Sequence, residues 1–309
     1  MTGFLQSYLC AWLFWFGIGL GATGILFLHA AVGGDWGRLI ERILESAART
    51  VPWMALLFIP VLLGFDRIFP HPYGEHEKIW MSSGFFIVRA VVLLALFAWL
   101  SAALWWRRKG GLGLLVWSFA VSVAAIDWMM SLDTHWYSTV YGALVGLGFM
   151  VTAFAFAIAA RAFLGGGPAA LSKPEPDAVH DLGNLLFAFL ILWAYLAFSQ
   201  YLIYWSGNIP DEISWYLHRE RGGWGGLGAA VFFFGFGVPF AALLFRPLKR
   251  RWRTLGSLSA FVLLTRPLDA YWLVKPAFHP AIAFQWTDLA AWAALGGAWS
   301  LLFRRVHER

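Results

Sequence analysis

The sequence predicts an all-α integral membrane protein with about nine transmembrane helices and little mass outside the membrane. Of its 309 residues, 60% are hydrophobic and 13% are charged, against about 25% charged in a typical soluble domain. The apolar residues form unbroken runs, and about 20 apolar residues cross the hydrocarbon core as a helix. A membrane barrel would alternate apolar and polar residues over about 10-residue segments. Runs such as 231–245 lack that alternation, so helices are predicted.

The predicted spans fall into two bundles. Residues 1–164 hold five spans and residues 181–309 hold four, joined by a linker rich in Gly, Pro and Ala at 165–180. The mixture of charged and apolar residues at 35–50 predicts an amphipathic helix on the membrane surface that leads into the second span. The nine spans are expected at 4–31, 50–65, 83–105, 112–131, 138–163, 182–206, 226–245, 254–275 and 281–303.

Lysine and arginine are distributed unevenly between the two sides that nine spans would create. The side holding the C-terminus has 16 of the 23 basic residues and the other side has 5, while Arg89 and Arg266 lie inside spans. Cytoplasmic loops carry the excess of basic residues. The C-terminus and the 165–180 linker are therefore predicted to be cytoplasmic, and the N-terminus is predicted to lie outside.

Four ionisable residues lie inside predicted spans, where a charge costs at least about 2.5–3.5 kcal/mol at the helix centre. Arg89 and Asp127 fall at roughly 9 and 6 Å from the outer surface, from a rise of about 1.5 Å per residue. Arg266 and Asp269 are three residues apart and so share one helix face. Such residues usually face a partner inside the bundle, so opposite charges at similar depth are expected to meet.

These residues have two interpretations: they assemble the bundle, or they transfer protons. Low dielectric disfavours the charged form of a carboxylate, which lets buried aspartates exchange protons near neutral pH. Asp133 and His135 follow Asp127 towards the outer surface and extend this candidate path, although His135 can equally be an interfacial residue that anchors a loop. Gln200 and Tyr204 share a helix face in the outer half of their span. Protein ligands for a metal or haem are not expected, since no two histidines have helical spacing.

Three groups of sequence strings resemble the ActF-type membrane subunit of alternative complex III. The first group resembles a "DW-MSL-(E/D)-HWxST" signature, and together the strings extend over most of the chain. They lie at 125–139, at 181–189 with 193–201, and at 205–212 with Trp215, Tyr216 and 222–224.

The resemblance implies the function and the partners. Such complexes are quinol:electron-acceptor oxidoreductases, and this subunit type has the fold of NrfD or polysulfide-reductase membrane subunits. The implied partners are a sister NrfD-like membrane subunit, a periplasmic iron–sulfur subunit and multihaem cytochrome c subunits. These would hold the haem c and the iron–sulfur clusters, and this chain would hold no redox centre. Whether it binds a quinone or quinol is left open by the sequence.

Family members usually have ten spans, so a leading helix is expected to be missing here. The resemblance also implies a proton-conducting role for this subunit type. Two alternatives remain: a purely structural anchor for periplasmic redox subunits, and an independent transporter.

Overall fold

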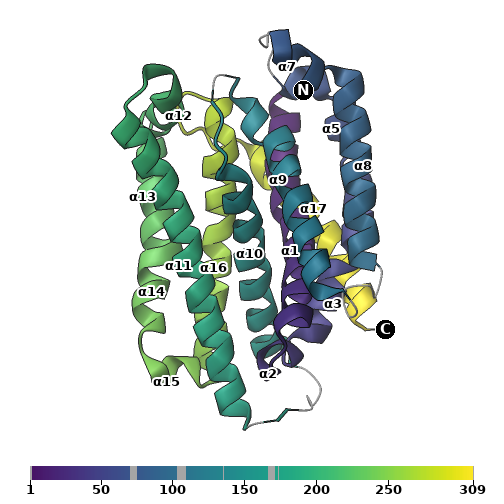
Figure 1. The fold of residues 1–309 in the computed structure, drawn as a ribbon, viewed down its shortest axis with the longest axis vertical. Helices are drawn as coiled ribbons and strands as arrows, with labels where there is room; N and C mark the ends of the chain where they lie inside the picture. Colours follow the sequence, from purple (N-terminus) through teal and green to yellow (C-terminus); the bar gives the residue numbers. More distant parts are fainter. Residues whose placement is uncertain are drawn as a thin grey trace.

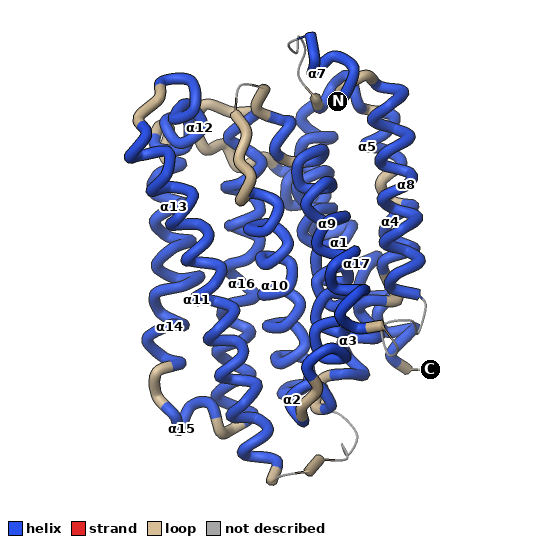
Figure 2. The backbone as a smooth tube through the Cα atoms, in the orientation of Figure 1, coloured by secondary structure: helices blue, strands red, loops and turns tan. Residues whose placement is uncertain are grey.

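The computed structural model describes residues 2–69, 75–102, 109–134, 136–165, 171–172 and 174–308, and these ranges contain helices and loops but no strand. The longer helices run side by side along the long axis of the molecule (Figure 1). Most loops lie at its two ends (Figure 2). This is the arrangement expected where a bilayer leaves no water for backbone groups outside helices.

The helices and helical turns follow one another along the whole chain. Their bounds are α1 (Thr2–Val32), α2 (Asp35–Arg38), α3 (Glu41–Ala48), α4 (Val51–Leu56), α5 (Ile59–Leu63), α6 (Phe65–Ile68), α7 (Glu75–Trp80), α8 (Ser83–Ala102), α9 (Gly110–Trp128), η2 (Met130–Leu132), α10 (Tyr141–Leu164), α11 (Glu175–Gly207), α12 (Pro210–Glu220), α13 (Trp224–Phe232), η3 (Phe233–Gly237), α14 (Val238–Leu243), α15 (Arg246–Lys249), α16 (Trp252–Val274), η4 (Lys275–Ala277) and α17 (Trp286–His307).

Seven helical stretches of the described chain are long and apolar enough to cross a membrane: α1, α3 to α5 taken together, α8, α9 with η2, α10, α11, and α13 to α14. The all-helical fold is thereby confirmed, and these seven stretches are compatible with a multi-pass membrane protein. α16 and α17 are of similar length, 23 and 22 residues, and run beside the others. Their sequences are less apolar than those of the seven stretches, partly because α16 carries Arg266 and Asp269. The count of nine spans stays a prediction.

The N-terminus lies near α7 and the C-terminus towards the opposite end (Figure 1). α15, which begins the group of five basic residues at 246–253, and α2, which holds Arg38, both lie at the end far from α7 and α12 (Figure 1). These two described segments therefore lie at the same end, as the charge count assumed. Which end faces the cytoplasm stays a prediction.

The centre of the bundle is formed by α1 and α10. About nine-tenths of the most apolar window of α1 is buried (89%), and α10 reaches 83%, whereas the α13–α14 stretch is only 22% buried. α10 packs against α1, α9, α11 and α16. A Cβ atom on Gly21 would lie 2.0 Å from the backbone oxygen of Phe149, so the two backbones meet where only glycine fits. Small residues allow such close approach in membranes.

The segment at 35–50 differs from the single amphipathic helix that its sequence suggested. It forms two short helices, α2 and α3, and the apolar face of α3 packs against α1 and α17. Ile43, Leu44 and Ala47 are buried there, while Arg42 is exposed. This apolar face is therefore covered by the protein itself. The second predicted span is also interrupted, with α4 and α5 separated at 57–58 and each beginning near a proline.

Helix α11 begins earlier than predicted. Pro176 occupies the first turn, with Glu175 and Asp177 beside it, and both proline and acidic residues stabilise a helix start. The last six residues of the proposed 165–180 linker are therefore helical. Helices of the two predicted bundles are in contact, since α17 packs on α1 and α16 on α10. The division into two bundles stays a prediction.

Candidate functional site

The first buried polar cluster surrounds Asp127 near the end of α9. Its carboxylate accepts a hydrogen bond from Arg89 Nε at 2.8 Å and one from Trp80 Nε1 at 2.9 Å. Arg89 also donates to the Trp80 carbonyl oxygen at 2.6 Å, and its guanidinium lies 4.0 Å from the centre of the Trp80 ring. Asp127 is fully buried. The expected meeting of Arg89 and Asp127 is confirmed, and Trp80 closes the cluster towards the α7 end of the bundle.

The second cluster is formed by Arg266 and Asp269 on α16. Their ion pair measures 2.7 Å, and both residues are about 5% exposed. Arg266 Nε donates to Thr152 Oγ1 on α10 at 3.2 Å, and the guanidinium lies 4.7 Å from the Trp193 ring on α11. A Cβ on Gly148 would lie 2.8 Å from the Arg266 guanidinium, so a larger residue there would have to displace the guanidinium. Three helices thus enclose this pair.

The two clusters are separate sites. α10 packs against both α9 and α16 and lies between them (Figure 1). Within the part of the chain that the structure describes, no hydrogen bond or ion pair connects Asp127 with Asp133. Asp133 lies beyond η2 and is partly exposed. His135, the last member of the predicted outward path, lies outside the described residues, so that path stays a prediction.

Gln200 and Tyr204 form a third group with the loop after η2 and with α12. Gln200 is buried, accepts a hydrogen bond from Ser138 Oγ at 3.1 Å and donates to the Tyr216 hydroxyl at 3.1 Å. The Tyr204 hydroxyl donates to the Tyr137 carbonyl oxygen. These contacts fix α12 over the C-terminal end of α11, which is a positioning role that the sequence did not predict.

A cavity of about 520 Å³ connects the second and third groups. Its polar lining includes Gln200, Tyr216, Arg219 and Asp269, and its walls are mainly aromatic. Volumes of roughly 300–1,000 Å³ with a few convergent polar groups are typical of ligand sites. Asp269 is therefore the predicted site residue that combines burial, a charged partner and access to a cavity.

Sequence reasoning missed Arg219, which was counted as an outer-loop charge. It is only 3% exposed, and its guanidinium lies 3.5 Å from the centre of the Trp215 ring. Burial lowers the pKa of Arg219 to about 10, so it remains protonated at neutral pH. The helical spacing of four between Trp215 and Arg219, in a segment rich in aromatic residues, was the signal available in the sequence.

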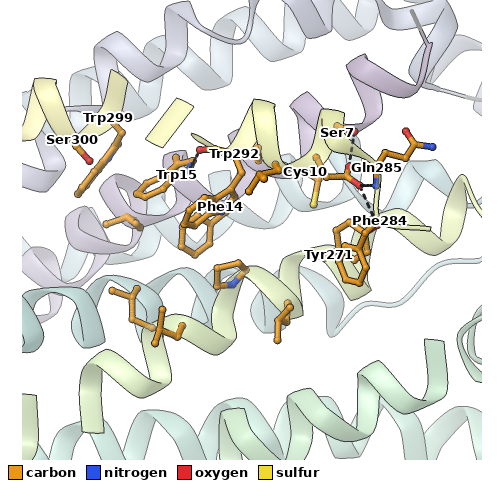
Figure 3. A pocket seen from close by; sticks show the side chains of 18 of the residues that line it. Ser7, Cys10, Phe14, Trp15, Tyr271, Phe284, Gln285, Trp292, Trp299 and Ser300 are labelled. Carbon is orange, nitrogen blue, oxygen red and sulfur yellow. Dashed lines mark hydrogen bonds between the residues drawn. The ribbon is translucent and has the colours of Figure 1, made fainter. Parts of the chain in front are cut away.

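A second feature that the sequence did not reveal is a groove of about 690 Å³ between α1, α16 and α17 (Figure 3). Ser7, Gln285 and Tyr271 lie at one end of it, and Trp299 and Ser300 lie at the other. Lys275, which is fully buried, pairs with Asp288 at the polar end over 2.5 Å, and Ser7 Oγ donates to the same carboxylate at 2.6 Å. These charges satisfy one another, so the groove presents an apolar wall.

Neither a scan against protein-family models nor a search of curated proteins found a match for this chain. Its resemblance to the ActF-type subunit therefore stays a prediction. What the described residues can do follows from their chemistry. Carboxylates that are buried and paired with guanidinium groups can exchange protons when the pair opens, and they can also stabilise the packing of helices.

Proposed function

We propose that this protein is the integral membrane subunit of a quinol-oxidising respiratory complex of the alternative complex III type. In this proposal it holds no redox centre and conducts protons. Its partners are the sister NrfD-like subunit, the periplasmic iron–sulfur subunit and the multihaem cytochrome c subunits, in a bacterial inner membrane.

The position of Asp269 is the observation that supports a proton-conducting role. Its carboxylate is buried, is paired with Arg266, and lines the cavity that Gln200 and Tyr216 also reach. A carboxylate in this setting meets the requirements for a proton donor and acceptor: low dielectric, a charged partner that holds its geometry, and access to an exchangeable group.

Further polar groups extend from Asp269 towards the middle of α16. Thr152 contacts Arg266, and Ser259 lies seven residues before Arg266 on the same helix face. Ser259 is fully buried, and its Oγ has no hydrogen-bond partner among the described residues. A water molecule beside it would satisfy the hydroxyl, and such waters are how a proton path would continue inwards.

Membership of the complex is tested by purification from the native membrane in mild detergent. Haem-containing and iron–sulfur subunits are expected to co-purify with this chain. A chain that is recovered intact and alone from such membranes would contradict the proposed assembly.

The proton role is tested in the purified complex with Asp269→Asn and Asp127→Asn. The isosteric amides preserve shape but cannot carry the proton. We expect Asp269→Asn to reduce quinol turnover and proton release by about tenfold or more, because positioned proton-transfer groups contribute roughly 10²–10⁴ in rate. The control is Asp177→Asn, whose exposed pair with Arg250 lies far from the cavity. Full turnover in an assembled Asp269→Asn complex would favour the structural anchor.

A further inference from the structure

Four basic side chains in the half of the bundle that contains α12 are largely or fully buried, and three of them have an aspartate partner. Arg89 pairs with Asp127 over 2.8 Å, Arg266 with Asp269 over 2.7 Å, and Lys275 with Asp288 over 2.5 Å. The fourth is Arg219. Among the described residues, no carboxylate lies within the 4 Å of an ion pair with it. Among the described residues at this end of the bundle, Arg219 is therefore a buried cation without a carboxylate partner.

The surroundings of Arg219 use only part of its hydrogen-bonding capacity. Nη1 donates to the Trp215 carbonyl oxygen at 3.1 Å and Nη2 to the Leu273 carbonyl oxygen at 2.9 Å. Nε is buried and has no partner among the described residues. A guanidinium has five N–H donors. Two carbonyl groups and an aromatic face hold the group in place, but they do not neutralise its charge.

The nearby carboxylates do not supply this missing charge. Asp133 is close enough to influence Arg219 electrostatically but forms no ion pair with it. Asp269 lines the same cavity and is already paired with Arg266. Glu220 lies at the rim and is exposed to solvent. An uncompensated buried charge is strongly unfavourable, which makes an anion from outside the chain the natural partner.

The cavity beside Arg219 is suited to an apolar body. Trp193, Trp215 and Trp272 form its walls, and small residues line the side contributed by α13. Phe198 and Phe232 are also part of the lining, and they are 58% and 54% exposed. These two residues lie on helices long and apolar enough to span a membrane, so a molecule dissolved in the bilayer can reach the cavity between them.

We propose that this cavity binds an anionic amphiphile with a long acyl chain, with its charged oxygen on Arg219 and its chain against the aromatic walls. Charge-assisted hydrogen bonds between guanidinium and carboxylate are among the strongest in proteins. A free fatty acid and an acidic phospholipid share this chemistry, because each joins an anionic oxygen, of a carboxylate or of a phosphate, to long acyl chains. The site shares its cavity with Asp269, but its test is independent of the function proposed above, because it requires only this chain and a bilayer.

The test uses the full chain in phosphatidylcholine nanodiscs and a photoreactive fatty acid with a diazirine near the end of its chain. Mass spectrometry is expected to locate the label on α11 and α13. Unlabelled palmitate should displace it, and methyl palmitate should not. Arg219→Gln should weaken labelling by about tenfold or more, the effect of losing a charge-assisted contact. Arg219→Lys should retain part of it.

Two further variants make the outcome decisive. Arg221→Gln removes the same charge from an exposed neighbour and should leave labelling unchanged. Ala197→Leu fills the cavity without altering charge and should abolish labelling even if Arg219→Gln does not fold. Nanodiscs containing phosphatidylglycerol distinguish the sources, because displacement of the label identifies the phospholipid and its persistence identifies the free fatty acid.

If methyl palmitate or a neutral quinone analogue displaces the label as well as palmitate does, the proposal is overturned. Labelling that is insensitive to both Arg219→Gln and Ala197→Leu would do so too. Neither result depends on whether the chain assembles with redox subunits, so failure here leaves the proposed function to its own test.

Discussion

Among the ion pairs described above, the one between Lys275 and Asp288 is expected to lose the most stability when its aspartate is neutralised. Lys275 is fully buried, and its other hydrogen bond is to Ser7 Oγ at 3.1 Å. Asp288 is 14% exposed and has three further donors: the Ser7 hydroxyl at 2.6 Å, the Tyr271 hydroxyl at 3.3 Å and the Gln285 backbone at 3.0 Å. The pair therefore connects α1, η4 and α17, and its two members differ in exposure and in the number of other hydrogen bonds that they form.

This inequality predicts an asymmetric response. Asp288→Asn leaves the Lys275 ammonium buried without a counter-ion, which costs about 3–5 kcal/mol. Lys275→Met leaves a carboxylate that keeps three donors and some contact with solvent, so its cost should be clearly smaller. The double variant should be more stable than Asp288→Asn alone, because replacing both members of a buried pair with neutral groups is often close to neutral.

The assay is reversible unfolding of the purified protein in mixed micelles, with the free energy of unfolding compared in a double-mutant cycle. The pair between Arg250 and Asp177 is the control, since its side chains are 36% and 43% exposed. Exposed pairs contribute only about 0–1 kcal/mol. Equal losses for the two single variants at Lys275 and Asp288, or a loss no larger than in the control pair, would refute this reasoning.

Three other predictions concern the packing of the bundle. Gly21→Ala should destabilise the protein by about 1–3 kcal/mol, because the new Cβ collides with the backbone of Phe149; Gly111→Ala, where nothing lies within 4 Å, should leave the thermal midpoint unchanged. Trp80→Phe should cost about 1–3 kcal/mol in the same assay, since the buried carboxylate that it binds loses a donor. Burial, reinforced by a nearby arginine, lowers the pKa of His307. The neutral imidazole therefore makes its full contribution to stability above the usual pKa of histidine. That contribution is lost as the pH falls through the lowered pKa of the folded protein. Melting curves from pH 8 to pH 5 should show this loss, and His307→Phe should flatten it; an unchanged slope in that variant would contradict the assignment.

The positions of the charged pairs were largely predictable because the membrane leaves few alternatives. Arg89 and Asp127 lie at similar depth in spans that are neighbours in the sequence, and α8 and α9 bring them together. Arg266 and Asp269 meet because three residues separate positions on one helix face. In both cases a charge in a low dielectric needs a partner, and the geometry of one helix or one helical hairpin supplies it.

The sequence was a poorer guide where a contact joined distant parts of the chain. Arg219 and Lys275 looked like ordinary loop charges, yet both are buried, one under Trp215 and Leu273 and the other against Ser7 and Asp288. The hydrogen bond from Lys275 to Ser7 links positions 268 residues apart. No local pattern encodes such a meeting, because it depends on how α1, α16 and α17 pack.

Composition and periodicity alone determined that the chain is helical, where its long apolar runs lie, and which charges inside those runs require partners. These properties are local: hydrophobic length and backbone hydrogen bonding act on each segment separately. Only the tertiary structure decided which loop charges are buried, that Asp269 lines a cavity, and that Arg219 lacks a counter-ion. Those properties depend on the space between helices, and that space is set by many side chains packing at once.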